Sequence, residues 1–343
     1  MSDDRTPSPA ATALDMSSTG SPKDQRQGTQ GHPRERFFYS TYGFSLVSHI
    51  PLPELVAIAP CDHPDIEIIA GHVDDTLAGG RQVNRWLQMA DDQCQMWIEG
   101  IANYRVEQGQ RIVIDRRVNE SIASAASPAD IRVYLLGSAL GVLAYQRGWL
   151  PLHINAVQAP SGELWAFTGP SGAGKSTLGV WLNTRRGWPQ VTDDVAVVKP
   201  EDSQPFLYAG PRKIKLWKET LEALQIDMSG AQRDLSRVDK FHIPVPGSSE
   251  VPPLAPLKHL VVLERGDGSR SRLTEVFGDE AVILLLDTLY RSEFGREFMA
   301  PEQIVQACEK LAMTMHVYCF CRPWSLEDMD NHLAPILKKA ELG

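Results

Sequence analysis

The sequence lacks a long apolar run, an excess of basic residues and a cysteine framework, and each absence excludes a class of protein. Its longest apolar stretches, such as Ala281 to Leu286, are far shorter than the ~18–20 residues of a membrane-spanning helix. Lys and Arg number 34 against 43 Asp and Glu, which gives a net charge of −9. This balance argues against a nucleic-acid or anionic-membrane partner and leaves room only for a local basic cleft.

Cysteines are few, scattered and odd in number, in a chain long enough to fold without disulfides. The five are Cys61, Cys94, Cys308, Cys319 and Cys321. The first residues include Asp3 and Asp4 and no apolar region, so no signal peptide is recognisable. We therefore expect reduced thiols and a cytoplasmic location.

The 343 residues predict two domains, or one domain with a sizeable appendage. Residues 1–36 are rich in Ser, Thr, Pro, Gly, Asp and Gln, and we expect a disordered tail because such a segment buries little apolar surface. Residues 37–148 predict a small β-rich domain that ends in a buried helix. Residues 149–343 predict an α/β domain.

The β-rich segment contains one clear hairpin signal and one clear helix signal. Glu107-Gln-Gly-Gln110 separates two strand-like runs and predicts a tight turn. Ser127 is a predicted N-cap, followed by Pro128 at the first helical position and Asp130 in a capping box. Gly148 is expected to end this helix.

The second half of the chain alternates between strand and helix patterns, which is typical of an α/β fold. Strands are predicted at Leu152–Ala159, Leu164–Thr168, Gln190–Val198, His259–Glu264 and His316–Cys321. Helices are predicted at Ser176–Arg186, Asp279–Tyr290, Pro301–Thr314 and Ser325–Lys339, with a basic segment and helix over Arg212–Leu224.

The strongest motif fits G-x-x-x-x-G-K-[ST], the pattern of a phosphate-binding loop. It reads Gly169-Pro170-Ser171-Gly172-Ala173-Gly174-Lys175-Ser176-Thr177. An apolar strand pattern precedes it and a helix pattern follows it, so backbone N–H groups and a helix N-terminus would surround phosphate oxygens. Lys175 would reach the β- and γ-phosphates and Ser176 would bind Mg²⁺. The motif therefore predicts nucleoside triphosphate binding.

Two adjacent carboxylates, Asp193 and Asp194, follow Lys175 by 18 and 19 residues. The strand after the loop helix would bring them back beside the phosphates. One could accept a proton from an attacking hydroxyl while the other holds Mg²⁺ or its waters. Taken without the loop, the same pair would be read as a strand-end turn or a solvated edge.

Several further residues have two interpretations each. His153 lies in an apolar strand pattern, where most histidines are packed core residues. Arg291 and Arg296 could complete a phosphate clamp or could be solvated at helix ends.

A short basic stretch follows the acidic pair. Arg212, Lys213, Lys215 and Lys218 surround Trp217. They could neutralise phosphate charge, hold an anionic peptide or form a solvated helix start.

The order of these motifs resembles the catalytic domain of HPr kinase/phosphorylase, a serine kinase related in fold to phosphoenolpyruvate carboxykinase. The match is closest over residues 149–200. The resemblance implies that Asp193 is the catalytic base toward a serine hydroxyl, assisted by His153. It also implies that Asp194 and Ser176 lie near Mg²⁺ and that residues 169–177 surround ATP.

Two positions depart from that family. Thr177 stands where the bifunctional enzymes carry Glu, and Ala209–Trp217 takes the place of their Glu-Ile-Arg-Gly-Leu-Gly signature. These departures leave phosphorylase activity, and HPr as the substrate, as open questions.

A nearer resemblance is to the HPr-kinase-like proteins encoded with lasso-peptide biosynthesis genes. It rests on Tyr42-Gly-Phe44, Leu52-Pro-Glu-Leu55, Leu152–Val157, the loop motif and Pro211–Trp217. It covers most of the chain beyond residue 36, and implies that a precursor peptide is phosphorylated on a serine, commonly the C-terminal one. Homo-oligomers are expected from the hexameric HPr kinases.

Other functions fit the motifs as well. Many kinases with such a loop act on metabolites rather than on peptides. A nucleotide-gated module that binds a peptide without catalysis would carry the same loop. Nucleic-acid binding is the function that the net charge favours least.

Overall fold

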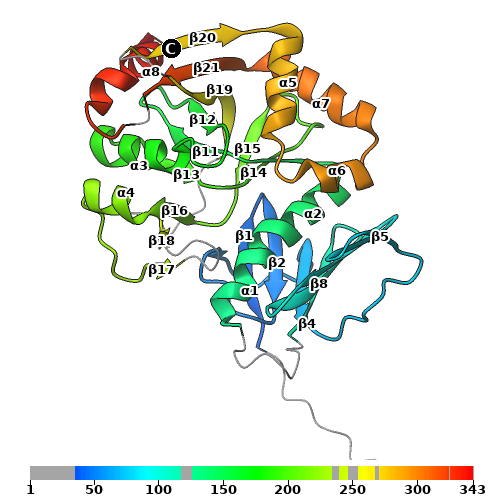
Figure 1. The fold of residues 1–343 in the computed structure, drawn as a ribbon. Coiled ribbons are helices and arrows are strands. Elements are labelled where there is room, and N and C mark those ends of the chain that lie inside the picture. The colour runs from blue at the N-terminus through cyan, green and yellow to red at the C-terminus, as the bar shows by residue number, and fades with distance from the viewer. Residues whose placement is uncertain are drawn as a thin grey trace, which may run out of the picture. The chain divides into compact units, whose positions relative to one another are not determined.

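The computed structural model describes residues 35–116, 126–233, 239–245, 254–266, 270–323 and 325–342. Glu35–Gly343 forms one compact unit of mixed α/β structure (Figure 1). The predicted tail lies outside the described residues except for its last two. Among the described residues, no helix combines the length and the apolar character that crossing a membrane would require.

The first sheet is built from β1 to β9, in the order β3-β1-β2-β4-β9-β8-β7-β6-β5. Its strands are β1 Phe37–Thr41, β2 Phe44–Ser48, β3 Val56–Ala57, β4 Ile66–Ala70, β5 Arg81–Asn84, β6 Leu87–Ala90, β7 Gln93–Ile98, β8 Ala102–Glu107 and β9 Arg111–Asp115. The predicted hairpin turn joins β8 and β9, and Gln108 and Gly109 both adopt positive φ there. The sequence signal for this hairpin is confirmed.

A helical segment lies against this sheet (Figure 1). Its parts are α1 Pro128–Tyr134, a π-helical turn Leu135–Ala139 and α2 Leu140–Gln146. Ser127 and Asp130 form the predicted capping box, and Gly148 has a φ of 72° just past the end. Beyond its first turn the segment is largely buried, and Leu140–Tyr145 is buried without a break, as its apolar residues on several faces predict.

The second sheet has the order β10-β14-β15-β19-β12-β11-β13, and β21 pairs with both β19 and β20. Its strands are β10 Leu150–Leu152, β11 Asn155–Gln158, β12 Leu164–Thr168, β13 Gln190–Thr192, β14 Ala196–Val198, β15 Phe206–Ala209, β19 Ala255–Arg265, β20 Arg272–Val276 and β21 His316–Arg322. Strands β12, β19 and β21 are parallel neighbours. The carboxyl ends of these three strands therefore meet at one edge, where ligands commonly bind in α/β sheets.

Helices cover both faces of this sheet. They are α3 Lys175–Arg186, α5 Gly278–Thr288, α6 Ser292–Phe298, α7 Pro301–Thr314 and α8 Met329–Leu342. Residues of α3 and α8 share one apolar cluster with one sheet face. Residues of α2, α5, α6 and α7 share a second cluster with the opposite face and with the first sheet. Figure 1 shows α3 and α5 on opposite sides of the sheet.

Two predicted strands are interrupted. The run Leu152–Ala159 is split at His153 and Ile154, because the chain leaves its pairing with β14 and joins β12 and β13 instead. The run Gln190–Val198 is split at Asp193–Val195, where Asp194 has a φ of 80°. Both breaks occur at candidate site residues.

A third sheet has the order β16-β18-β17. It is formed by β16 Lys213–Trp217, β17 Gln232–Arg233 and β18 Lys240–Pro244, and α4 Lys218–Ala223 follows β16. The expected helix over Arg212–Leu224 is thus wrong in its first half. The alternation of Lys and apolar residues in β16 has period two, so one face packs against α3 and α4 while the other carries the lysines.

Aromatic and cationic side chains join the first sheet to the second. The Phe44 and Trp149 rings are stacked with centroids 4.5 Å apart. The Arg147 guanidinium lies 4.4 Å from the Phe44 centroid and the Lys199 ammonium lies 3.8 Å from that of Trp149. Each such cation–π contact contributes about 0.5–2 kcal/mol. This stack anchors the start of β10 beside the first sheet.

A partly buried ion pair ties α1 to the turn between β2 and β3. Arg132 Nε lies 2.9 Å from both carboxylate oxygens of Glu54, and the two side chains are 9% and 13% exposed. The backbone oxygen of Glu54 accepts a 2.8 Å hydrogen bond from the Arg212 N–H. The turn is therefore held between α1 and the segment that leads into β16.

Replacing Arg132 with Gln should lower the free energy of unfolding by about 3 kcal/mol, because Glu54 would keep a poorly solvated charge without its partner. The control is Arg111→Gln, which breaks the exposed pair with Glu67 (47% and 46% exposed) and should cost no more than about 1 kcal/mol. Urea unfolding of both variants measures the difference. Equal losses would contradict the structural role given to the Arg132–Glu54 pair.

Candidate active site

The glycine loop connects β12 to α3 at the carboxyl edge of the second sheet. Gly169, Gly172 and Gly174 have φ values of 136°, 88° and 85°, which side chains rarely adopt. A Cβ on Gly169 would lie 2.8 Å from the Leu263 carbonyl oxygen, so no side chain fits there. The loop and the N-terminus of α3 face a pocket of about 590 Å³.

Residues from several distant segments line this pocket. They are His153, Ser171–Thr177, Asp193, Asp194, Lys215, Trp217, Glu219, Thr220, Lys240, Arg291, Arg322, Ser325 and Leu326. The structure thus brings together the predicted loop, both aspartates, His153 and Lys215, which is one of the four lysine or arginine residues of the predicted basic stretch. Gly169 and Pro170 form the start of the loop and do not line the pocket.

The Lys175 side chain lies back on its own loop. Its ammonium donates to the carbonyl oxygens of Gly169 and Pro170 at 2.7 and 3.4 Å. Burial lowers its pKa, against the opposing effect of Asp193 and Asp194. An anion in the pocket would offer the ammonium a stronger acceptor than these two carbonyls.

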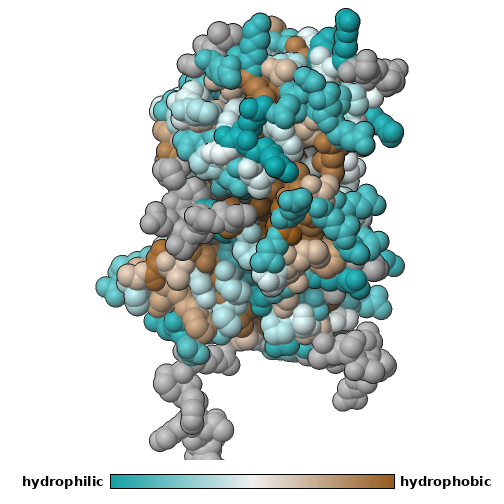
Figure 2. Space-filling view, turned by 90° about the vertical axis from the view of Figure 1, so that its left-hand side faces the viewer, coloured by the Kyte–Doolittle hydropathy of each residue, from teal (hydrophilic) through white to brown (hydrophobic). Residues whose placement is uncertain are grey.

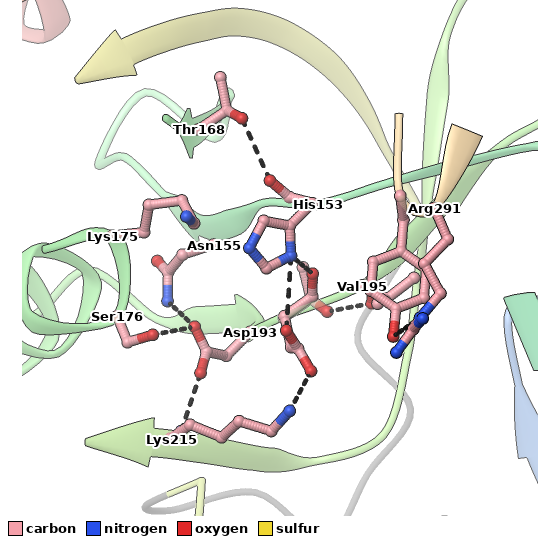
Figure 3. Close-up of polar contacts among 12 residues, drawn as sticks. His153, Asn155, Thr168, Lys175, Ser176, Asp193, Val195, Lys215 and Arg291 are labelled. Carbon is pink, nitrogen blue, oxygen red and sulfur yellow. Dashed lines mark hydrogen bonds and ion pairs between the residues drawn. The ribbon is translucent and has the colours of Figure 1, made fainter. Parts of the chain in front are cut away.

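Asp193 is a buried carboxylate at the centre of a hydrogen-bond network (Figure 3). Its Oδ1 accepts from Ser176 Oγ at 2.8 Å and from Asn155 Nδ2 at 2.9 Å. Its Oδ2 accepts from the backbone N–H of Lys215 at 2.9 Å. Burial raises the pKa of Asp193, and these hydrogen bonds oppose that rise.

Asp194 has a different environment. Its carboxylate forms an ion pair with the Lys215 ammonium, and its Oδ1 lies 3.4 Å from His153 Nδ1. Burial acts to raise its pKa, but Lys215 and His153 outweigh burial and hold the pKa well below the usual range. A positive φ at a residue other than glycine costs about 1 kcal/mol or more, and such strain clusters at functional sites.

His153 is fixed by its backbone in the break between β10 and β11. Its N–H donates to the Thr288 oxygen at 2.8 Å, and its own carbonyl oxygen accepts from Thr168 Oγ1 at 3.1 Å. Its ring Nδ1 lies 3.0 Å from the Asp194 carbonyl oxygen. Burial lowers the pKa of His153, with Asp194 opposing. The imidazole is therefore directed at the aspartate pair rather than packed in the core.

The remaining predicted cations fall in different places. Lys215 reaches the pocket, whereas Arg212 and Lys213 line a second cleft of about 140 Å³. Arg291 lines the main pocket, and its Nε donates to the Tyr290 hydroxyl at 3.3 Å. Arg296 lies in α6 and is not among the pocket residues.

Sequence reasoning missed Asn155, which orients Asp193. Its side chain is fully buried and packs against Gly179 of α3, where a Cβ would lie 1.9 Å from Asn155 Oδ1. The glycine inside the helix pattern and the polar residue inside the strand pattern were the available signals. Their meaning depends on a contact between separate elements.

Sequence reasoning also missed Arg322, at the carboxyl end of β21. This side chain is only 3% exposed, and its Nη2 lies 3.2 Å from where a Cβ on Gly174 would stand. Nη1 donates to the Pro323 oxygen at 3.0 Å, while the buried Nε has no hydrogen-bond partner among the described residues. A guanidinium so placed is suited to an anion at the start of α3.

The site offers oxygen ligands for Mg²⁺. Ser176 Oγ and Asp193 Oδ1 are 2.8 Å apart, and Asp194 belongs to the same pocket. No cluster of three or more His, Cys, Asp or Glu suited to a metal occurs in the described part of the chain. Mg²⁺ usually needs only one or two carboxylates when phosphate oxygens and waters complete its shell. These residues therefore fit a phosphate-bound magnesium ion.

Comparisons with known proteins give little. No family model matches the chain, and no curated protein matches it. Among solved structures it is similar to the HPr(Ser) kinase/phosphatase from Coxiella burnetii, with 14% identity, a TM-score of 0.31, and coverage of 56% of this chain and 90% of that one.

Replacing Gly179 with Ala should displace Asn155 and lower the free energy of unfolding by about 1–3 kcal/mol, the usual cost of overpacking. Urea unfolding of Gly179→Ala, Asn155→Ala and the double variant measures the coupling. We expect the double variant to be more stable than the sum of the single losses predicts, since the second change removes the clash. Additive losses would contradict the contact.

Proposed function

We propose that this protein is an ATP- and Mg²⁺-dependent kinase that transfers the γ-phosphoryl group to a serine hydroxyl of a peptide or small protein. The observation that carries the proposal is the Ser176–Asp193 hydrogen bond. It joins the glycine loop to a buried carboxylate, as a site that must hold phosphate, metal and acceptor together requires.

Nucleotide binding is supported by the donors around the loop. The backbone N–H groups at the start of α3, the Lys175 ammonium and the Arg322 guanidinium surround one end of the pocket. About 590 Å³ lies within the range of small-molecule sites. Mg²⁺, held by Ser176 and Asp194, would neutralise charge on the phosphates.

The two aspartates divide the remaining tasks in our proposal. The serine oxygen attacks the γ-phosphorus, the bond to the β–γ bridging oxygen breaks, ADP leaves, and the hydroxyl proton passes to Asp193. Asp193 suits this role because its pKa is raised by burial. Asp194, kept ionised by Lys215, would hold Mg²⁺ or its waters, and His153 would orient the pair.

The opposite division has an observation in its favour. Ser176, the proposed magnesium ligand, contacts Asp193 rather than Asp194, and His153 lies beside Asp194. Asp193 would then bind Mg²⁺ with Ser176 and Asp194 would receive the proton. The variants described below distinguish the two.

The acceptor is the least constrained part of the proposal. A lasso-peptide precursor, modified on its C-terminal serine, is supported only by the sequence motifs that resemble such kinases. HPr and small metabolites remain alternatives, and so does a non-catalytic, nucleotide-gated peptide-binding module. A cytoplasmic location and a homo-oligomer also remain predictions.

Intact-mass spectrometry of serine peptides and of HPr, incubated with the protein, ATP and Mg²⁺, tests the kinase. Phosphoryl transfer adds ~80 Da to the acceptor. Asp193→Asn should reduce transfer by at least about a hundredfold, the lower range for general acid–base catalysis, with Mg²⁺-ATP affinity nearly unchanged. Asp194→Asn should weaken Mg²⁺-dependent ATP binding instead. The reverse pattern would assign the base to Asp194, and transfer that survives both changes would overturn the proposal.

Arg322→Gln should raise the Kd for ADP by about tenfold or more, because a charge-assisted hydrogen bond to phosphate is lost. Arg322 is buried and pairs with no carboxylate among the described residues. Because its charge is uncompensated, its removal should not lower the Tm of the nucleotide-free protein. The control is Arg265→Gln, which removes the same charge from the exposed residue paired with Arg322 in register. Calorimetric Kd values that are equal for both variants would contradict the phosphate contact.

A further inference from the structure

Three cavities follow one another behind the glycine loop. The main pocket and a small cavity of about 10 Å³ share Asp193, Asp194 and Lys215 as lining residues. The small cavity and the second cleft, of about 140 Å³, share Val133 and Lys213. Asp193, Asp194 and Lys215 therefore separate the main pocket from the small cavity, and Val133 and Lys213 separate the small cavity from a cleft between α1 and the third sheet.

The position of the second cleft suits one part of an acceptor. In phosphoryl transfer the attacking oxygen approaches in line with the leaving oxygen and from the opposite side. With the nucleotide on the loop, the acceptor must reach the aspartates from a side that the nucleotide does not fill. The second cleft borders the small cavity that Asp193 and Asp194 line, and no residue of the glycine loop lines this cleft.

One face of β16 borders all three cavities. Lys213, Lys215 and Trp217 alternate with Ile214 and Leu216, which are buried on the opposite face. Lys215 pairs with Asp194 at the main pocket, and Lys213 lines the cleft two residues earlier. Two residues of a strand span about 6.6–7 Å. The two lysine side chains therefore leave the strand about 6.6–7 Å apart. Lys215 reaches the main pocket and Lys213 reaches the second cleft.

Lys213 has no anionic partner in the described part of the chain. Two carboxylates, those of Glu54 and Asp194, oppose the lowering of its pKa, but they pair with Arg132 and Lys215. Burial, together with Lys215 and Arg132, lowers the pKa of Lys213 to about 8. A carboxylate entering the cleft would relieve this unfavourable environment, and it would find Arg212, Arg233 and His242 in the same lining.

We propose that this cleft binds an acidic side chain of the peptide acceptor, and that Lys213 thereby selects substrates with Asp or Glu two residues from the phosphorylated serine. The inference rests on the proposed kinase function and specifies its substrate class. We expect a spacing of two residues because an extended peptide that lies alongside β16 repeats its side-chain positions with the same period as the strand. The acidic residues that line the cleft do not compete, since Glu54 pairs with Arg132 and Asp130 caps α1.

The test compares serine peptides that differ at one position, two residues before or after the serine, with Asp, Ala or Lys there. We expect kcat/KM for the Asp peptide to exceed that for the Ala peptide by about tenfold or more on one side, since 1.4 kcal/mol corresponds to a factor of ten. Lys213→Gln should bring this ratio close to one. Lys213→Glu should reverse the preference toward the Lys peptide.

The matched control is Lys218→Gln. Lys218 follows the same strand, is 54% exposed and pairs with Glu222, so its loss should leave the ratio unchanged. A wild-type ratio near one on both sides of the serine, or a ratio that Lys213→Gln does not change, would overturn the proposal while leaving the kinase function intact.

A binding measurement distinguishes failure of the kinase proposal from failure of the cleft proposal. If the wild type phosphorylates none of the peptides, fluorescence anisotropy of the same peptides is measured on the ADP-bound protein. Tighter binding of the Asp peptide that disappears in Lys213→Gln would support the cleft and count against the kinase. Equal binding of the Asp and Ala peptides would overturn the cleft.

Discussion

The candidate site depends on one buried carboxylate, that of Asp193. An ionised group removed from water is stable only when hydrogen bonds replace its hydration. Three segments supply them: α3 through Ser176, β11 through Asn155 and β16 through the backbone of Lys215. The glycine loop, the second sheet and the third sheet are therefore fixed relative to each other at the point where the chemistry is proposed. Gly179 makes this possible by allowing Asn155 close to α3.

The first sheet packs against residues that flank the aspartate pair, although its sequence contains no catalytic motif. Tyr42 lies in the turn between β1 and β2, and its N–H donates to the Ala209 oxygen at 2.9 Å. Its side chain lines the small cavity beside Asp194, where burial raises its pKa well above the usual value. Gly210 has no room for a side chain, because a Cβ would meet the Tyr42 ring at 2.8 Å. The first sheet and the strand pairing around the aspartates are thus packed as one structure. Figure 2 shows hydrophobic residues reaching the surface at mid-height of the face in view.

Local patterns predicted local structure well. The helix Pro301–Thr314 and the capping box at Ser127 are confirmed, because caps and apolar periodicity determine such elements within a few residues. The breaks at His153 and Asp194 could not be read from the sequence, since an apolar run does not reveal that a strand changes partners. The role of Arg322 could not be predicted from the sequence for a related reason. Its place beside the glycine loop follows from the parallel pairing of β12, β19 and β21. The loop and the acidic pair could be proposed from sequence, but the way they share hydrogen bonds could not.

The distribution of charge around the main pocket has a kinetic consequence. The chain carries a net charge of −9, yet its main pocket gathers Lys175, Lys215, Lys240, Arg291 and Arg322 around fewer carboxylates. An anion approaching elsewhere meets a repelling field, whereas the low-dielectric walls of the pocket concentrate positive potential at its mouth. Encounter with a multiply charged ligand is therefore guided by long-range attraction before any contact forms. Added salt would screen this attraction and slow the encounter step, whereas it would change dissociation much less.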